Sequence, residues 1–183
     1  MSTGILAIDP GNTESAYALI DAATRRPRAF EKVPNDVLLD RLAGLAYESR
    51  AVAVEMVASY GMAVGAEVFD TCVWIGRFTE RIGYERVGLV KRLPVKLHHC
   101  HDSKAKDTNI RQALVDRFAP GQPNHGKGIK AEPGWFHGFH SDIWAAYALA
   151  VYVADTTQDS VPVACASGEE RLAAGTDPTE EDQ

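Results

Sequence analysis

Residues 4–21 read GILAIDPGNTESAYALID, two apolar runs separated by an Asp-Pro-Gly sequence. Residues 5–8 form the kind of short apolar run that makes a strand buried on both faces, and residues 15–21 follow as a second strand. Asp9 stands where the first strand ends. Because Pro and Gly favour turns and Asp tolerates them, a simple hairpin turn explains Asp9 as well as a metal-binding carboxylate does. Acidic residues elsewhere in the chain must decide between the two interpretations.

Apolar patterns along the rest of the chain predict a mixed α/β fold. Three strands with short links suggest an antiparallel meander, and alternating strands and helices follow it. This order predicts a mixed five-stranded sheet, its first three strands antiparallel, with helices on both faces. The predicted strands are 5–8, 15–21, 28–33, 51–56 and 87–93. The predicted helices are one capped by Asn35, then 62–82, 106–118 (capped by Asp107 or Thr108) and 141–154, with a Gly- and Pro-rich loop over 119–138.

Composition favours a globular intracellular protein. The chain has 183 residues and is 45% hydrophobic, enough for one domain with a real core. No basic, apolar leader and no apolar run of about 18 residues is present, so we expect a cytoplasmic protein without a membrane partner. Three cysteines without a Cys-x-x-Cys pair indicate neither a disulfide framework nor a zinc module. The HHCH sequence at 98–101 is a poor zinc site, because adjacent side chains cannot all reach one ion.

Charge is distributed unevenly along the chain. The net charge of −6 is carried by residues 156–183, which hold seven acids and one base, whereas 1–155 is balanced. Within the balanced part, residues 86–130 hold ten Lys or Arg against three Asp. Such a basic segment suits phosphate binding, although a solvated charged face would look the same. We expect a domain over 1–155 and an acidic, disordered tail over 156–183.

Two further acids occupy positions comparable to that of Asp9. Glu55 closes the apolar strand AVAVEM, and Asp142 opens the last predicted helix. Asp142 alone could simply complement a helix N-terminus. Ligands of open α/β sheets gather at strand ends, however, and three crowded carboxylates repel one another unless a divalent cation binds between them. Hard oxygen ligands of this kind favour Mg²⁺ or Mn²⁺.

Three motifs together resemble a known family. AIDPGNTESAYALID, AVEMVASYGMAVG and the helix DIWAAYALAVY are similar to the catalytic motifs of RuvC-type Holliday junction resolvases, which have the ribonuclease H-like fold. The resemblance covers residues 4–153 and is greatest to the small bacteriophage resolvases. It implies a homodimeric crossover junction endodeoxyribonuclease that binds two Mg²⁺, or Mn²⁺ as a substitute, through Asp9, Glu55 and Asp142. The family's common Asp-x-x-Asp pattern is broken here, because Ala145 stands at the second position.

In this interpretation the basic segment contacts DNA. Tyr60 could stack on an unpaired base at the junction centre, with core packing as the alternative. His140 could assist as a ligand or proton carrier, or be a bystander. The candidate phosphate-binding residues lie before and after one predicted helix and are Lys104, Lys106, Lys127 and Lys130.

The sequence leaves three other functions open. A ribonuclease H-like nuclease acting on flaps or RNA–DNA hybrids would use the same chemistry. An actin-like ATPase would need a second Gly-rich phosphate motif and a longer chain, and a non-catalytic DNA-binding module would not need three acids. If the protein is phage-encoded, we expect it in the cytoplasm of the bacterial host.

Overall fold

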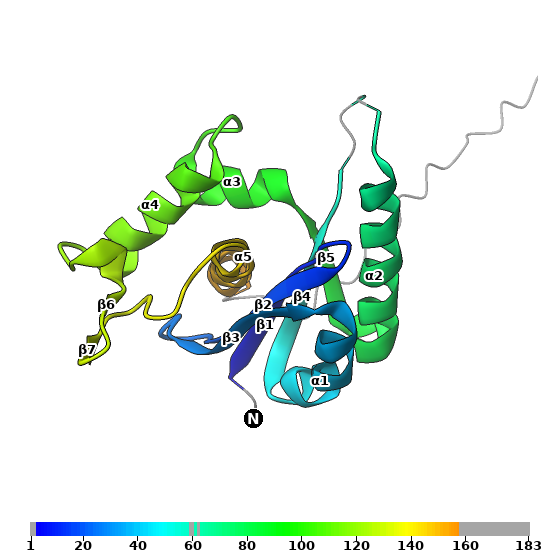
Figure 1. Cartoon of the computed structure of the whole chain (residues 1–183), viewed down its shortest axis with the longest axis horizontal. Coiled ribbons are helices and arrows are strands. Elements are labelled where there is room, and N and C mark those ends of the chain that lie inside the picture. The colour runs from blue at the N-terminus through cyan, green and yellow to red at the C-terminus, as the bar shows by residue number, and fades with distance from the viewer. Residues whose placement is uncertain (1–2, 59–60, 62, 158–183) are drawn as a thin grey trace, which may run out of the picture.

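A five-stranded mixed sheet forms the centre of the molecule (Figure 1). The computed structural model describes residues 3–58, 61 and 63–157. The strand order is β3-β2-β1-β4-β5, with β1, β2 and β3 antiparallel and with β4 parallel to both β1 and β5. The predicted fold class is therefore confirmed. The strands are β1 (Gly4–Asp9), β2 (Glu14–Asp21), β3 (Pro27–Pro34), β4 (Ser49–Met56) and β5 (Val87–Lys91).

Helices cover both faces of this sheet. On one face lie α1 (Asn35–Tyr47) and α2 (Ala66–Ile82), and on the other lies α5 (Ile143–Thr156), with α3 (Arg92–Cys100) and α4 (Asp107–Phe118) packed beside it. A short hairpin follows α4. It is made of β6 (Gly128–Ile129) and β7 (Glu132–Pro133), and single 3-10 turns occur at Tyr84–Arg86 and Asn124–Gly126. None of the described helices is long and apolar enough to cross a bilayer.

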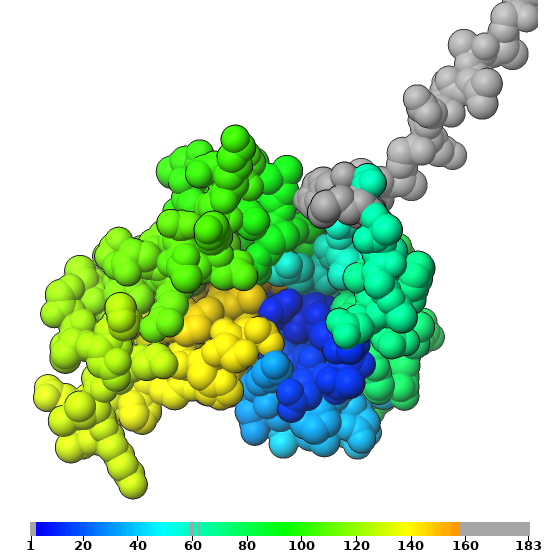
Figure 2. Space-filling view, turned by 45° about the horizontal axis from the view of Figure 1, so that its top comes forward, coloured from blue at the N-terminus to red at the C-terminus, as the bar shows by residue number. Residues whose placement is uncertain are grey.

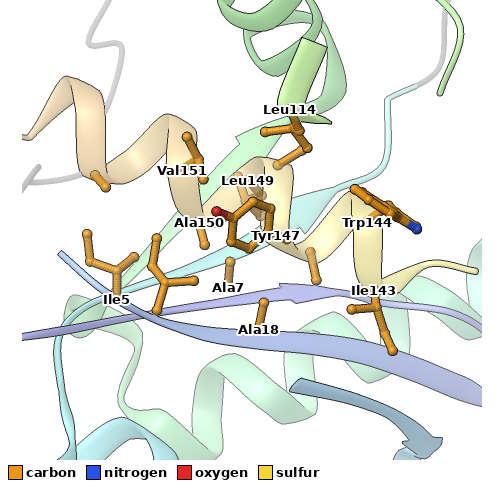
Figure 3. Close-up of a cluster of buried hydrophobic side chains, with 14 of the residues drawn as sticks. Ile5, Ala7, Ala18, Leu114, Ile143, Trp144, Tyr147, Leu149, Ala150 and Val151 are labelled. Carbon is orange, nitrogen blue, oxygen red and sulfur yellow. The ribbon is translucent and has the colours of Figure 1, made fainter. Parts of the chain in front are cut away.

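Side-chain alternation along the strands produces two cores. Successive strand residues point to opposite faces, so Leu6 and Ile8 join the core under α1 and α2 while Ile5 and Ala7 face α5. The α5 side of the sheet is lined by small residues such as Ala7 and Ala18, and α5 is itself rich in alanine (Figure 3). Small side chains on both surfaces allow the helix to lie close to the sheet, which fixes the position of its N-terminal end.

The sequence did not predict α3 or the β6–β7 hairpin. The predicted strand over 87–93 ends at Lys91, and a helix begins at Arg92. Pro94 argues against a helix in the sequence, but it occupies the first turn, where its missing N–H has no intrahelical partner to lose. The long helix predicted over 62–82 begins only at Ala66, and Met62 lies outside the described residues.

The predicted helix caps are also wrong. Asn35 is the first residue of α1 and does not cap it, because its side chain is hydrogen-bonded to Gly11 and Ser15. Helix α4 begins at Asp107, and the residue before it, Lys106, occupies the cap position. The backbone N–H of Lys106 donates to the Oδ1 atom of Asn109, the third residue of the helix.

Asp155 joins four elements at the far end of α5. Its carboxylate accepts hydrogen bonds from Arg25 in the β2–β3 turn (Nη2, 2.9 Å), His98 in α3 (2.8 Å) and Arg117 in α4 (Nη1, 2.6 Å). Burial alone raises the pKa of Asp155, but the donors from Arg117, His98 and Arg25 outweigh it and hold the pKa well below its usual range. The predicted domain boundary at 155 falls here. The predicted acidic tail lies beyond it, outside the described residues from 158 onward.

Removing Asp155 should destabilise the domain. Asp155→Ala leaves the buried Arg25 without its carboxylate, and breaking such a pair costs about 3 kcal/mol. Urea denaturation should therefore show a lower midpoint with an unchanged slope. Arg41→Ala, which removes an exposed pair with Glu31, is the control and should leave the midpoint nearly unchanged. Equal midpoints for Asp155→Ala and wild type would contradict a stabilising role for the cluster.

Candidate active site

Sheet register brings Asp9 and Glu55 side by side. In the parallel β1–β4 pair, Ile8 is aligned with Val54, so the next residues of the two strands occupy neighbouring positions at their carboxyl ends. Both carboxylates lie two residues beyond alanines that face α5, and therefore on that same face of the sheet. The two acids thus lie at the carboxyl ends of neighbouring strands, on the face of the sheet that α5 covers.

Asp142 reaches the same region from the start of α5. It immediately precedes the helix, and its side chain is half exposed. The Nζ atom of Lys32, on β3, lies 2.8 Å from its Oδ2 atom and 3.7 Å from a carboxylate oxygen of Glu14. Asp142 is therefore held by a basic residue from the sheet.

Glu55 is held by a different basic residue. Nη1 of Arg92 donates to Oε2 of Glu55 at 2.9 Å, and Nη2 of the same guanidinium donates to Oδ1 of Asp107. Arg92 is the first residue of α3 and Asp107 the first of α4, so two helices meet the sheet at this contact. One guanidinium thus bridges a strand-end acid and a helix-end acid.

These groups line one pocket of about 230 Å³. Figure 2 shows the face where β1 (blue), the segment leading into α5 (yellow) and the α3–α4 region (green) meet. Acidic and basic side chains share the pocket with an apolar wall. The lining residues are Asp9, Glu55, Arg92, Asp107, Ile110, Arg111, Ser141, Asp142, Trp144 and Ala145.

Electrostatic crowding is strongest at Asp9. Burial, followed by the negative charges of Glu55 and Asp142, raises the pKa of Asp9 to about 8, although Arg92 opposes the shift. Burial also raises the pKa of Glu55, and Arg92 again opposes it. A divalent cation would relieve both the repulsion and the cost of burial.

The turn that follows Asp9 is rigidly supported. The Gly11 N–H donates to the Ser15 hydroxyl, which donates to Oδ1 of Asn35, and Nδ2 of Asn35 donates to the Gly11 carbonyl. A Cβ atom at Gly11 would lie 2.3 Å from the Glu14 carbonyl oxygen, so this tight turn requires glycine. Asp9 is consequently fixed by the strand before it and by the turn after it.

Comparison with known proteins identifies the fold. No protein-family model and no curated protein matches the sequence. Thermus thermophilus RuvC in complex with a Holliday junction substrate superposes with a TM-score of 0.57 at 17% identity, covering 83% of this chain and 93% of that one. A second Thermus thermophilus RuvC structure gives 0.54 at 18% identity, covering 84% and 96%. The chain has the RuvC-type, ribonuclease H-like fold.

Within this RuvC-type fold the pocket also contains residues that the sequence did not single out. The sequence marks Asp107 only as a candidate helix cap, and Arg92 and Arg111 only as members of a basic segment. Arg92 could not be placed because α3 was not predicted. Ala145, the position of the absent fourth acid, does line the pocket, as the motif spacing implied.

The other predicted site residues lie around the pocket or outside the described part. His140 is exposed and does not line the pocket, and Tyr60 lies outside the described residues. Lys104 and Lys106 precede α4, whereas the other two lysines lie beyond its far end, at the β6–β7 hairpin. Helix α4 has twelve residues, about 18 Å, so the four lysines form two groups and not one patch.

The donor set fits a divalent metal by its chemistry. Asp9, Glu55 and Asp142 offer hard carboxylate oxygens around one pocket, as Mg²⁺ and Mn²⁺ require. Within the part of the chain that the structure describes, no three His, Cys, Asp or Glu side chains are close enough together to hold a metal as they stand. Glu55 and Asp142 are instead bonded to basic residues, so metal binding requires their side chains to turn. The HHCH residues do not form a site either, because His98 contacts Asp155 and His99 the Ala148 carbonyl.

The raised pKa of Asp9 should appear as a pH-dependent stability. Because the folded protein holds this proton more tightly than the unfolded chain, Asp9 is destabilising as pH rises from about 4 to about 8. Asp9→Asn cannot ionise and should therefore be more stable than wild type at pH 8 in EDTA, because it avoids the cost of burying a charged carboxylate. Urea denaturation between pH 4 and 9 measures this difference. It should vanish near pH 4, and a difference that does not change with pH would contradict the shifted pKa.

Proposed function

We propose that the protein is a structure-selective endonuclease that resolves four-way DNA junctions by metal-dependent phosphodiester hydrolysis, a crossover junction endodeoxyribonuclease. The observation that carries this proposal is the convergence of Asp9, Glu55 and Asp142 on one pocket of a RuvC-type fold. Three carboxylates are more than a structural turn or a helix cap needs. Their convergence supports a catalytic metal site.

In this proposal, Asp9, Glu55 and Asp142 hold two Mg²⁺, for which Mn²⁺ can substitute. When bound, the two ions supply an activated water and stabilise the leaving 3′ oxygen. Asp9 must release its proton to act as a ligand, and burial of its carboxylate makes that release dependent on the cation. Ile110 and Trp144 form the apolar wall of the pocket beside these acids.

The DNA partner is proposed on similar grounds. The neighbour with the higher TM-score is RuvC in complex with a Holliday junction substrate. We propose that the lysines at both ends of α4 contact phosphates of separate arms, and that Tyr60 and His140 are auxiliary residues. Because a four-way junction needs two symmetric cuts, we propose a homodimer. A phage-type role in the host cytoplasm belongs to the same proposal.

The competing functions make different demands on the pocket. An actin-like ATPase needs a pocket for a nucleotide base, and a volume of about 230 Å³ lined mainly by charged side chains offers no such room. A flap or hybrid nuclease would use the same acids on a different substrate. It is therefore the second candidate, and the substrate itself must distinguish the two.

A cruciform plasmid provides the deciding experiment. A dimer that cuts opposite strands of like polarity linearises the circle, whereas a single cut only relaxes it. We expect mainly linear product with ligatable 5′-phosphate and 3′-hydroxyl ends in Mg²⁺. Relaxed circles alone, or faster cutting of flaps or RNA–DNA hybrids, would leave a nuclease but refute junction resolution.

Variants of the three acids are the controls for this assay. Asp9→Asn, Glu55→Gln and Asp142→Asn should each lower cleavage by roughly a thousandfold or more, since the carboxylate charge is needed for metal binding. Junction binding should persist, because the proposed phosphate-binding lysines lie elsewhere. Near-normal nicking by any one variant would remove that residue from the site.

The lysines before α4 can be tested separately. Lys104→Ala/Lys106→Ala should weaken junction binding and lower the slope of log affinity against log salt by roughly one for each phosphate that a lysine neutralises in wild type. Fluorescence anisotropy in Ca²⁺ at several salt concentrations measures both quantities. Arg81→Ala, on the opposite face of the sheet in α2, is the matched control and should change neither. An unchanged slope in the double variant would indicate a merely solvated face.

A further inference from the structure

Arg92 is the best-connected basic residue of the pocket. Its side chain is largely buried, and its two terminal nitrogens bind two different carboxylates, Glu55 and Asp107. The guanidinium is a rigid planar fork, so one hydrogen bond can be exchanged while the other is kept. Glu55 is largely buried, whereas the side chain of Asp107 is 80% exposed.

We propose that the Arg92 guanidinium occupies the position of a metal cation at Glu55. When a metal binds Glu55, Arg92 leaves that carboxylate and binds a DNA phosphate instead. The proposal rests on the proposed nuclease function and adds a residue to it that the motifs do not contain. Arg92 would remain bonded to Asp107 throughout, which keeps its guanidinium at the pocket while its second edge changes partner.

Competition between Arg92 and a metal follows from the geometry. The Oε2 atom of Glu55 accepts the Arg92 hydrogen bond at 2.9 Å, so a metal that binds this oxygen competes with the guanidinium for it. After displacement, the free edge of the guanidinium faces the same pocket as Asp9. A bidentate donor beside the acids is well suited to a phosphate oxygen, whose negative charge would take the place of the Glu55 carboxylate.

Arg111 is a second basic residue of this pocket, and it provides a comparison for Arg92. Its guanidinium lies 4.9 Å from the centre of the Trp144 ring, and it forms no ion pair with any carboxylate in the described part of the chain. Both arginines contribute positive charge to the pocket, but of the two only Arg92 is bonded to a proposed metal ligand. A substitution of Arg111 therefore distinguishes direct competition for Glu55 from a general effect of positive charge on metal binding.

Metal binding without DNA is the primary test. Isothermal titration of Mn²⁺ into EDTA-treated, dialysed protein should show about tenfold tighter binding for Arg92→Gln than for wild type, since one charge-assisted hydrogen bond no longer has to be displaced. Arg111→Gln, the matched control, should change the affinity less than twofold. Unchanged or weaker Mn²⁺ binding by Arg92→Gln, or an equal gain in both variants, would overturn the exchange.

Cleavage of the junction is the second readout. At saturating Mg²⁺, Arg92→Gln should cut at least a hundredfold more slowly despite its tighter metal binding, and Arg92→Lys should recover part of the rate. If Arg92 had only a structural role, Arg92→Gln would lose metal binding, cleavage and thermal stability together. That result would refute the proposal. If wild type cuts no junction, the proposed function fails, while the Mn²⁺ titration still decides the exchange between Glu55 and metal.

Discussion

Repulsion among carboxylates at the end of a sheet is the constraint on which the site depends. The β1–β4 register places Asp9 beside Glu55, and the close packing of α5 brings Asp142 to the same pocket. The fold meets this repulsion by supplying a separate basic partner to each of two acids, Arg92 to Glu55 and Lys32 to Asp142. Among the described residues, Asp9 has no such ion-pair partner of its own, and burial together with the neighbouring carboxylates raises its pKa to about 8.

The position of α5 links stability to the site. The helix presents Asp142 at one end, and at the other end Asp155 binds groups from α3, α4 and the β2–β3 turn. Alanine-rich contact with the sheet removes room for the helix to shift between these ends. The ion-pair cluster around Asp155 therefore also fixes α3 and α4, the helices that begin with Arg92 and Asp107.

Sequence patterns were sufficient to predict that the acids lie close together, but not to predict which side chains they contact. Asp9 and Glu55 could be predicted because an acid that closes an apolar strand is visible in one short window, and strand ends converge in this class of fold. The position of Arg92 could not be predicted, because Pro94 argues against the helix that Arg92 begins. In addition, Arg92 contacts residues that are far from it in the sequence. The same reason applies to Asn35, whose side chain supports the Gly11 turn and not its own helix.

The pocket contains a fourth carboxylate, although Ala145 stands where the resemblance would place one. Asp107 already brings another carboxylate to the pocket from the start of α4, so an acid at Ala145 would add a fifth. The basic residues in contact with these acids or with the pocket are Lys32, Arg92 and Arg111. Lys32 also lies 3.7 Å from a carboxylate oxygen of Glu14, so the acids at and around the pocket outnumber these three cations even when Asp9 carries a proton. Loss of the Asp9 proton adds one more negative charge beside the oxygen ligands, and this excess of negative charge favours binding of a cation at the pocket.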